Sequence, residues 1–180
     1  MSKIESIEEL IQELDAHHPE AFVKIAKRMR IPLCEYEPYA LWKPGGYTRN
    51  CIERTAKYEL LLLCWAPGSE TAIHGHNEQR CWVHQVEGSL LETRYRMLDD
   101  ERLVKDHTVQ LTPGKLSFMM DEMGFHTLKN PTDEGAMSLH LYISPIDVCD
   151  SYDPHSKEFL SKPLEYDSFK GVIKEVYNSL

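Results

Sequence analysis

The N-terminal segment of the chain has the periodicity of an amphipathic helix. Ser6 followed by Glu9 matches the capping-box pattern, in which each side chain bonds to backbone N–H groups at the helix start. The apolar residues that follow recur every three to four positions: Ile7, Leu10, Ile11 and Leu14. The sequence therefore predicts a helix over residues 6–16.

A second helix is predicted from Pro19, because proline is favoured at the first helical position. Its inner face would be made by Phe22, Ile25, Ala26 and Met29. The two helices make up a helical N-terminal segment over residues 1–30.

From about Tyr47 onward the pattern changes to short apolar or alternating runs, separated by Gly, Pro, Asn and Asp. About seven such runs predict strands, beginning with "YELLLLCW" and "TAIHGH" and ending with "AMSLHLYI". This spacing favours an all-β sandwich or barrel over residues 47–145, within a single domain that spans residues 1–180.

The region after Pro145 is polar and irregular, so no strands are predicted there. The last stretch, "SFKGVIKEVYNSL" (168–180), predicts a short closing helix.

Composition narrows the class of protein. A net charge of −9 over 180 residues would repel the phosphates of nucleic acid, and the longest apolar run, residues 60–66, is too short to cross a bilayer. The N-terminus lacks the pattern of a signal peptide, and five cysteines without a CxxC pair argue against a disulfide framework. We therefore expect a cytoplasmic monomer with no nucleic-acid or membrane partner.

Two histidines separated by one residue stand at the start of "HGHNEQRC" (74–81). In an extended segment, His74 and His76 point to the same side, and their imidazoles can bind one metal ion. For an isolated pair of this kind, solvated loop histidines are the simpler interpretation.

The spacing of glycines and histidines around this stretch resembles the first motif of the cupins, small jelly-roll barrels that hold a metal in the barrel mouth. His126 matches the later histidine of the second cupin motif. Cupins usually carry Glu at the position of Cys81, so the metal would face three neutral histidines. The resemblance implies a cupin double-stranded β-helix (jelly-roll) barrel with N-terminal α-helices.

The run "SLHLY" places Ser138, His140 and Tyr142 on one strand face. An amphipathic strand whose polar residues face solvent would give the same pattern. Upstream, "YTRN" places Tyr47 and Arg49 before an apolar strand. The planar guanidinium suits a carboxylate, although a surface charge is the ordinary interpretation.

Taken together, "YTRN", "LLLCW", "HGHNEQRC", "GFH" and "SLHLY" resemble the cysteine dioxygenase family in order and spacing over residues 47–149. The resemblance implies that His74, His76 and His126 bind Fe(II). It also implies that Arg49 holds the carboxylate of L-cysteine, with a contribution from Tyr47.

The same resemblance assigns roles to the residues around the metal. Tyr142 would lie over the iron, positioned by His140 and Ser138. From its strand face alone, Tyr142 is also expected to meet Cys81 across the barrel. In some family members the matching cysteine and tyrosine are joined by a thioether. Two further residues would border the pocket: Leu63 and Trp65. The implied reaction adds both atoms of O2 to the cysteine sulfur, giving cysteine sulfinic acid.

Three alternatives remain at the level of sequence. The first alternative is a dioxygenase for another thiol, such as 3-mercaptopropionate. Relatives of that kind often carry Gln in place of Arg49 and lack the Cys81 equivalent. A cupin that binds metal and a small ligand without turnover, as a sensor or storage protein, is the second. A metal-dependent isomerase is the third, disfavoured because the usual acidic ligand is missing.

Overall fold

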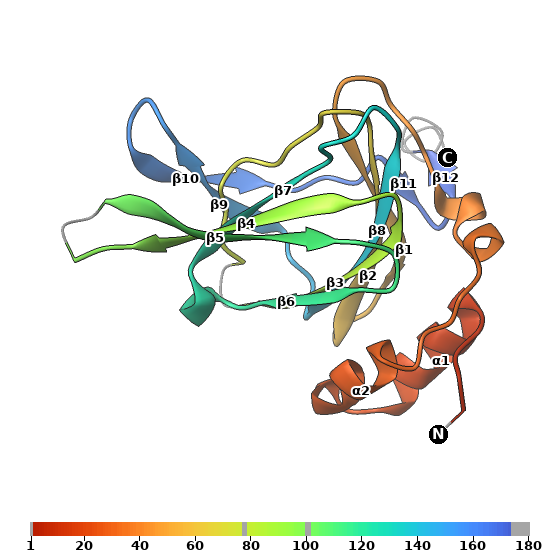
Figure 1. The fold of residues 1–180 in the computed structure, drawn as a ribbon. Coiled ribbons are helices and arrows are strands. Elements are labelled where there is room, and N and C mark those ends of the chain that lie inside the picture. The colour runs from red at the N-terminus through yellow and green to blue at the C-terminus, as the bar shows by residue number, and fades with distance from the viewer. Residues whose placement is uncertain (1, 77–78, 100–101, 174–180) are drawn as a thin grey trace.

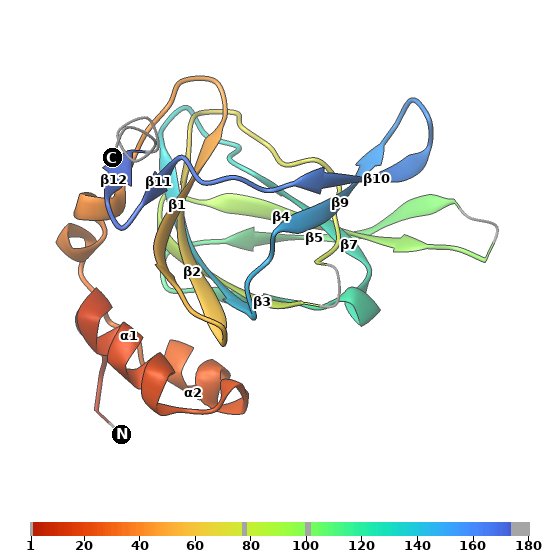
Figure 2. The same cartoon turned by 180° about the vertical axis from the view of Figure 1, so that it is seen from behind.

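Two β-sheets packed face to face build the core of the protein, and helices cover one outer face (Figures 1 and 2). The structure is a computed structural model that describes residues 2–76, 79–99 and 102–173. The larger sheet has seven strands in the spatial order β12 (Val172–Ile173), β11 (Ser168–Phe169), β1 (Tyr47–Arg54), β2 (Tyr58–Trp65), β8 (Ala136–Ile143), β3 (Arg80–Glu87) and β6 (Leu116–Met119).

The smaller sheet has three strands in the order β5 (Leu103–Leu111), β4 (Leu90–Met97) and β7 (Phe125–Lys129). A separate hairpin of β9 (Val148–Asp153) and β10 (Glu158–Pro163) follows β8. One apolar cluster contains residues from both sheets, so the sheets enclose a shared interior. This arrangement confirms the predicted cupin barrel with an all-β core.

The central strands β2 and β8 are buried along their whole length because each has a covered face on both sides. In β2, Leu60, Leu62 and Cys64 pack with the helices. The alternate residues Leu61, Leu63 and Trp65 face the barrel interior. The period of two along a strand thus explains why "YELLLLCW" is continuously apolar.

The N-terminal helices cover the outer face of the larger sheet (Figure 1). Helix α1 (Ile7–Ala16) begins after Ser6, whose hydroxyl accepts a hydrogen bond from the Glu9 N–H at 3.1 Å. A 3-10 turn (Pro19–Ala21) leads into α2 (Phe22–Ala26). The predicted start of the first helix is confirmed, whereas the second α-helix begins at Phe22 instead of Pro19 and is short. Further 3-10 turns lie at Leu33–Glu35, Glu37–Tyr39 and Asp121–Met123.

Three sequence-based expectations about secondary structure are wrong. The run "TAIHGH" is not a strand, and it pairs only through isolated bridges of His74 to His126 and to Ser151. The region after Pro145 contains the β9–β10 hairpin. In place of the predicted closing helix, residues 168–173 form β11 and β12, and the remainder of that prediction lies outside the described residues.

Among the described residues, the structure contains no helix with the length and apolar character needed to span a membrane.

Candidate metal centre and its pocket

The loop between β2 and β3 carries two of the three histidines that the sequence singled out. This loop runs beside β7 and β9: Glu70 bridges to Lys129, and His74 bridges to both His126 and Ser151. The backbones of His74 and His126 exchange two hydrogen bonds of 3.0 Å each. These bridges hold the loop against β7 and place its histidines beside His126.

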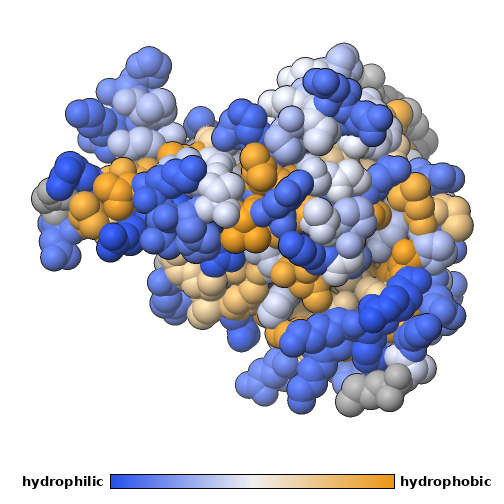
Figure 3. All heavy atoms as spheres, in the orientation of Figure 1, coloured by the Kyte–Doolittle hydropathy of each residue, from blue (hydrophilic) through white to orange (hydrophobic). Residues whose placement is uncertain are grey.

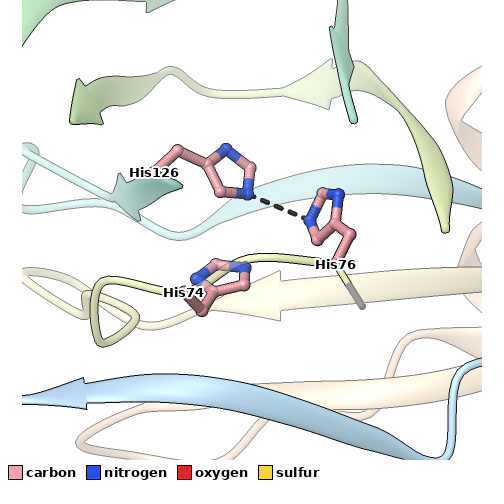
Figure 4. Close-up of side chains that lie close together, drawn as sticks. All are labelled: His74, His76 and His126. Carbon is pink, nitrogen blue, oxygen red and sulfur yellow. Dashed lines mark hydrogen bonds between the residues drawn. The ribbon is translucent and has the colours of Figure 1, made fainter. Parts of the chain in front are cut away.

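The three histidine rings converge (Figure 4). Their ligand nitrogens all lie within 4.8 Å of one another. His126 Nε2 lies 3.1 Å from His76 Nε2, and the ring centroids of His74 and His126 are 4.5 Å apart. Two ligands that each lie about 2.1 Å from a shared ion would have a similar separation, so the group could hold a metal ion.

Hydrogen bonds show which ring nitrogen carries the proton in His74 and in His126. His74 Nδ1 lies 2.9 Å from the Ala72 carbonyl oxygen, and His126 Nδ1 lies 3.0 Å from Glu92 Oε1. Because a carbonyl and a carboxylate only accept, each Nδ1 carries the proton. Nε2 of each ring therefore keeps the lone pair that a metal needs.

Burial keeps the imidazoles of His74 and His76 neutral. The pKa of His74 is lowered to about 3, chiefly by burial and then by the neighbouring His126. The pKa of His76 is lowered well below its ordinary value for the same two reasons. Metal binding requires deprotonated imidazole, so the site is suited to a cation at neutral pH.

Glu92 of β4 was not identified from the sequence, although it supports the centre. Its side chain is buried, with the carboxylate accepting from His126 and from the Ser117 hydroxyl, and with Arg94 Nη2 3.4 Å away. Burial raises the pKa of this carboxyl, but these neighbours outweigh it and lower the pKa on balance. In "LLETRYRM", the alternation with buried Leu90 was the available signal.

The histidines open into a cavity of about 260 Å³. The residues predicted to bind substrate all line it, and so do His140 and Tyr142, which were predicted to act at the metal: Tyr47, Arg49, Leu63, Trp65, His140 and Tyr142. Within the described structure, Arg49 Nε and Nη2 are buried without a hydrogen-bond partner. This guanidinium can therefore bind an anion that enters the cavity.

Cys81 and Tyr142 are neighbours within one sheet. The expectation that they meet across the barrel is wrong, because β3 pairs directly with β8 and places their Cα atoms opposite one another. Both side chains belong to the interior cluster. Burial raises the pKa of the Cys81 thiol, and a hydrogen bond with Tyr142 offsets part of that rise.

The three polar residues of "SLHLY" face the interior, not solvent. Trp65 Nε1 donates to Ser138 Oγ at 2.8 Å, which leaves the Ser138 hydroxyl proton for His140 Nε2, also at 2.8 Å. The rings of His140 and Tyr142 lie nearly parallel with centroids 6.4 Å apart. A continuous row of side chains therefore runs from Trp65 to Tyr142.

The β9–β10 hairpin supplies part of the cavity wall, which the sequence analysis did not anticipate. Buried Cys149 lines the cavity, and its thiol donates to the Gly75 carbonyl at 3.4 Å. Lys162, paired with Cys149 in the hairpin, also lines it. No motif marks these residues, because only the return of the hairpin over the barrel brings them to the site. His84 faces the helices.

The fold and the histidine group define a cupin with a candidate metal centre. The family profile described as "Cysteine dioxygenase type I" matches residues 2–155. The chain belongs to the cysteine dioxygenase type I family.

Individual relatives agree with this assignment. The chain is similar to cysteine dioxygenase type 1 of Homo sapiens, with 32% identity over 123 residues, 66% of this chain and 62% of that protein. It is also similar to cysteine dioxygenase type 1 of Danio rerio, with 28% identity over 84% of this chain and 81% of that protein. The match therefore spans less than two thirds of the human relative.

A solved structure supports the fold alone. The protein TT1209 from Thermus thermophilus matches with a TM-score of 0.50 and 17% identity, over 60% of this chain and 92% of that chain.

Proposed function

We propose that this protein is a thiol dioxygenase that uses Fe(II) and O2 to oxidise L-cysteine to cysteine sulfinic acid. The observation that carries the proposal is the placement in one cavity of a histidine triad and of Arg49, whose Nε and Nη2 have no hydrogen-bond partner among the described residues. The family membership supports the same activity.

Fe(II) fits the donor set of this chain. His74, His76 and His126 would hold it through neutral nitrogens, which leaves the ion its full charge and open positions for further ligands. When bound, the ferrous ion would supply the binding and activation of thiolate and O2. Glu92 would fix the ring of His126 through the hydrogen bond to Nδ1.

Arg49 would position the substrate carboxylate. Its buried Nε and Nη2 offer N–H donors in a planar fork. Tyr47 lines the same cavity, with its ring centroid 4.8 Å from that of Trp65. Together these residues would orient cysteine with its thiol toward the histidines.

Tyr142 would direct its hydroxyl toward the reacting groups. Burial raises the pKa of Tyr142 well above its ordinary value, so the phenol keeps its proton and can donate. Ser138 and His140 would position this ring through the hydrogen bond between them and the parallel packing of His140 on Tyr142. A thioether between Cys81 and Tyr142, which are direct cross-strand neighbours, would fix the ring further.

The stoichiometry of the reaction balances without another reductant. One thiol and one O2 give one sulfinic acid, so sulfur is oxidised by four electrons while O2 is reduced and both its atoms are retained. The largely enclosed barrel interior would limit the access of water during this step.

We further propose that the protein acts in the cytoplasm. All five cysteines are free thiols, as is usual in a reducing compartment.

Oxygen uptake tests the proposed activity. Fe(II)-loaded protein should consume O2 with L-cysteine and produce one equivalent of cysteine sulfinic acid per O2. A variant with His74→Ala should lose bound iron and uptake together, whereas His18→Ala, with a side chain that is 78% exposed, should retain both. Absence of uptake at confirmed iron occupancy would refute the enzymatic function and favour a binding protein. Faster turnover of 3-mercaptopropionate than of cysteine would refute the substrate assignment.

A further inference from the structure

A second cleft lies on the other side of the larger sheet from the histidines. It has a volume of about 710 Å³ and lies between the end of α2, strand β3 and the turn before β6. In β3, Cys81 and Val83 face the barrel interior, whereas His84 faces this cleft and the helices. The volume is within the usual range for sites that bind small organic molecules.

Three cationic side chains line the cleft: Lys27, Arg30 and Lys115. No Asp or Glu is among the described residues of its wall, even though the whole chain carries a net charge of −9. Arg30 donates to backbone carbonyls of Lys27 and Met29, and Lys115 donates to the Gln110 carbonyl. These contacts leave the positive charges without carboxylate partners, so the cleft is locally cationic.

Three buried polar atoms of residues in the same wall lack hydrogen-bond partners among the described residues: Tyr36 Oη, His84 Nδ1 and Gln85 Oε1. Tyr36 is only 1% exposed. Buried polar groups in folded proteins almost always have a partner, and an exception often marks the place of a bound molecule. Burial, with a smaller effect of Glu35, raises the pKa of Tyr36, so its hydroxyl remains a donor.

The rest of the wall is apolar. Met29, Ile31 and Leu116 line the cleft between the cations and the helix-covered core. In Figure 3 a band of hydrophobic surface separates the hydrophilic helices at the lower right from the hydrophilic strands above. A ligand of this cleft would therefore combine an anionic group with an apolar body.

We propose that this cleft is a binding site for a small organic anion, with its carboxylate or phosphate group held by Arg30, Lys115 and the Tyr36 hydroxyl. Lys27 adds positive charge at the rim, and the apolar body of the ligand packs on Met29 and Leu116. The proposal goes beyond the proposed dioxygenase function, because it uses neither the histidine triad nor Arg49.

Calorimetric titration of the metal-loaded protein tests the site with three probes. Benzoate and phenyl phosphate carry an anionic group on one apolar ring, and benzamide is the neutral control. We expect both anions to bind and benzamide not to bind; the tighter anion identifies the preferred head group. The double variant Arg30→Gln/Lys115→Gln should weaken binding by at least about tenfold, and Tyr36→Phe by roughly threefold or more.

Matched controls separate this cleft from other cationic surfaces. Lys24 lies on the same helix as Ala26 but does not line the cleft, so Lys24→Gln should leave binding within about twofold. Arg49→Gln should also leave it unchanged. Equal binding of benzamide, loss of binding in Arg49→Gln, or full binding in Arg30→Gln/Lys115→Gln would each overturn the proposal. So would failure of both anions to bind the unaltered protein, and none of these results depends on oxygen uptake.

Discussion

At the scale of single residues, the site depends on how each buried polar atom is partnered. His126 uses Nδ1 for Glu92 and keeps Nε2 for the centre, while Arg49 retains donors that no described residue occupies. Removing such a partner leaves a buried polar group without a hydrogen bond, so the cost of removing that group from water is no longer compensated. Three predictions follow from individual side chains.

Replacing Glu92 with Gln should weaken metal binding by roughly tenfold to a hundredfold. The neutral amide still accepts from His126 Nδ1 but no longer supports the ring with a negative charge. Titration against a competing chelator measures the change. Glu87, which is exposed on β3, provides the control Glu87→Gln, and equal affinity of the two variants would contradict a supporting role for Glu92.

Replacing Arg49 with Gln should raise the apparent Michaelis constant for L-cysteine roughly thirtyfold, equivalent to about 2 kcal/mol. The loss of a partly desolvated, charged contact with the carboxylate is the physical reason. A smaller rise is expected for 3-mercaptopropionate, because dioxygenases of that thiol often carry Gln at this position. Arg96→Gln, at an exposed position of β4, is the control. Equal effects on the two thiols would show that Arg49 does not discriminate between them.

Cys81→Ser should abolish a thioether with Tyr142 if that bond forms. The two residues are cross-strand neighbours, so the unaltered protein should give a doubled band on denaturing gels and a mass lower by two hydrogens. Cys64→Ser, in the helix-facing cluster, should keep both signals. An intact mass without that loss in the iron-loaded protein after turnover would refute the bond.

At the scale of elements, strand β7 depends on a close approach to β4. Gly124 precedes β7 with a φ of 88°, and a Cβ there would lie 2.3 Å from the Tyr95 carbonyl oxygen. His126 pairs with Arg94 in the same ladder. The glycine therefore permits the strand pairing that places a metal-site histidine.

Gly124→Ala should lower the free energy of unfolding by roughly 2–4 kcal/mol and reduce metal affinity. Backbone strain and the clash with β4 both contribute to the loss. Gly45→Ala is a matched control: its φ is 74°, but a Cβ would meet no atom within 4 Å. It should cost about 1–2 kcal/mol from strain alone and leave metal affinity unchanged. Urea denaturation and chelator titration measure both effects, and similar losses of affinity would disprove the argument.

At the scale of the whole molecule, the larger sheet separates two environments. Its inner face lines the cavity into which the histidines open, and its outer face packs against the helices. Histidines with lowered pKa values lie on both faces: the pKa of His140 is lowered to about 3, by burial and then by Arg49. The pKa of His84 is lowered to about 4, by burial and then by Arg30.

The stability of the metal-free protein should therefore fall as the pH drops below about 6.5. In this range the unfolded chain binds protons that the folded His84 and His140 do not, so the free energy of unfolding decreases by about 1.5 kcal/mol per ring between pH 6.5 and 5. Full stability is present above this range. His84→Gln should reduce the slope measured by urea denaturation, whereas His18→Gln, at an exposed position, should not. An unchanged slope in His84→Gln would contradict the prediction.

The sequence by itself predicted those helices and strands that are specified by residues close to one another along the chain. The capping residues around Ser6 and the short apolar runs of β2 and β8 are signals between neighbours a few positions apart. The spacing of His74 and His76, together with the cupin resemblance that added His126, predicted a shared site, and the structure brings the three rings together. The strand predicted for the loop before His76 was wrong, yet its bridges to β7 and β9 produce the same convergence.

Only the tertiary structure decided which side chains complete the pocket. Glu92, Cys149 and Lys162 reach the site through strand pairing and through the return of the C-terminal hairpin, contacts that no local pattern encodes. Sheet order likewise decided that Cys81 and Tyr142 are neighbours within one sheet. The physical reason is that periodicity specifies which face of a strand is buried, whereas the packing of distant segments specifies what that face meets.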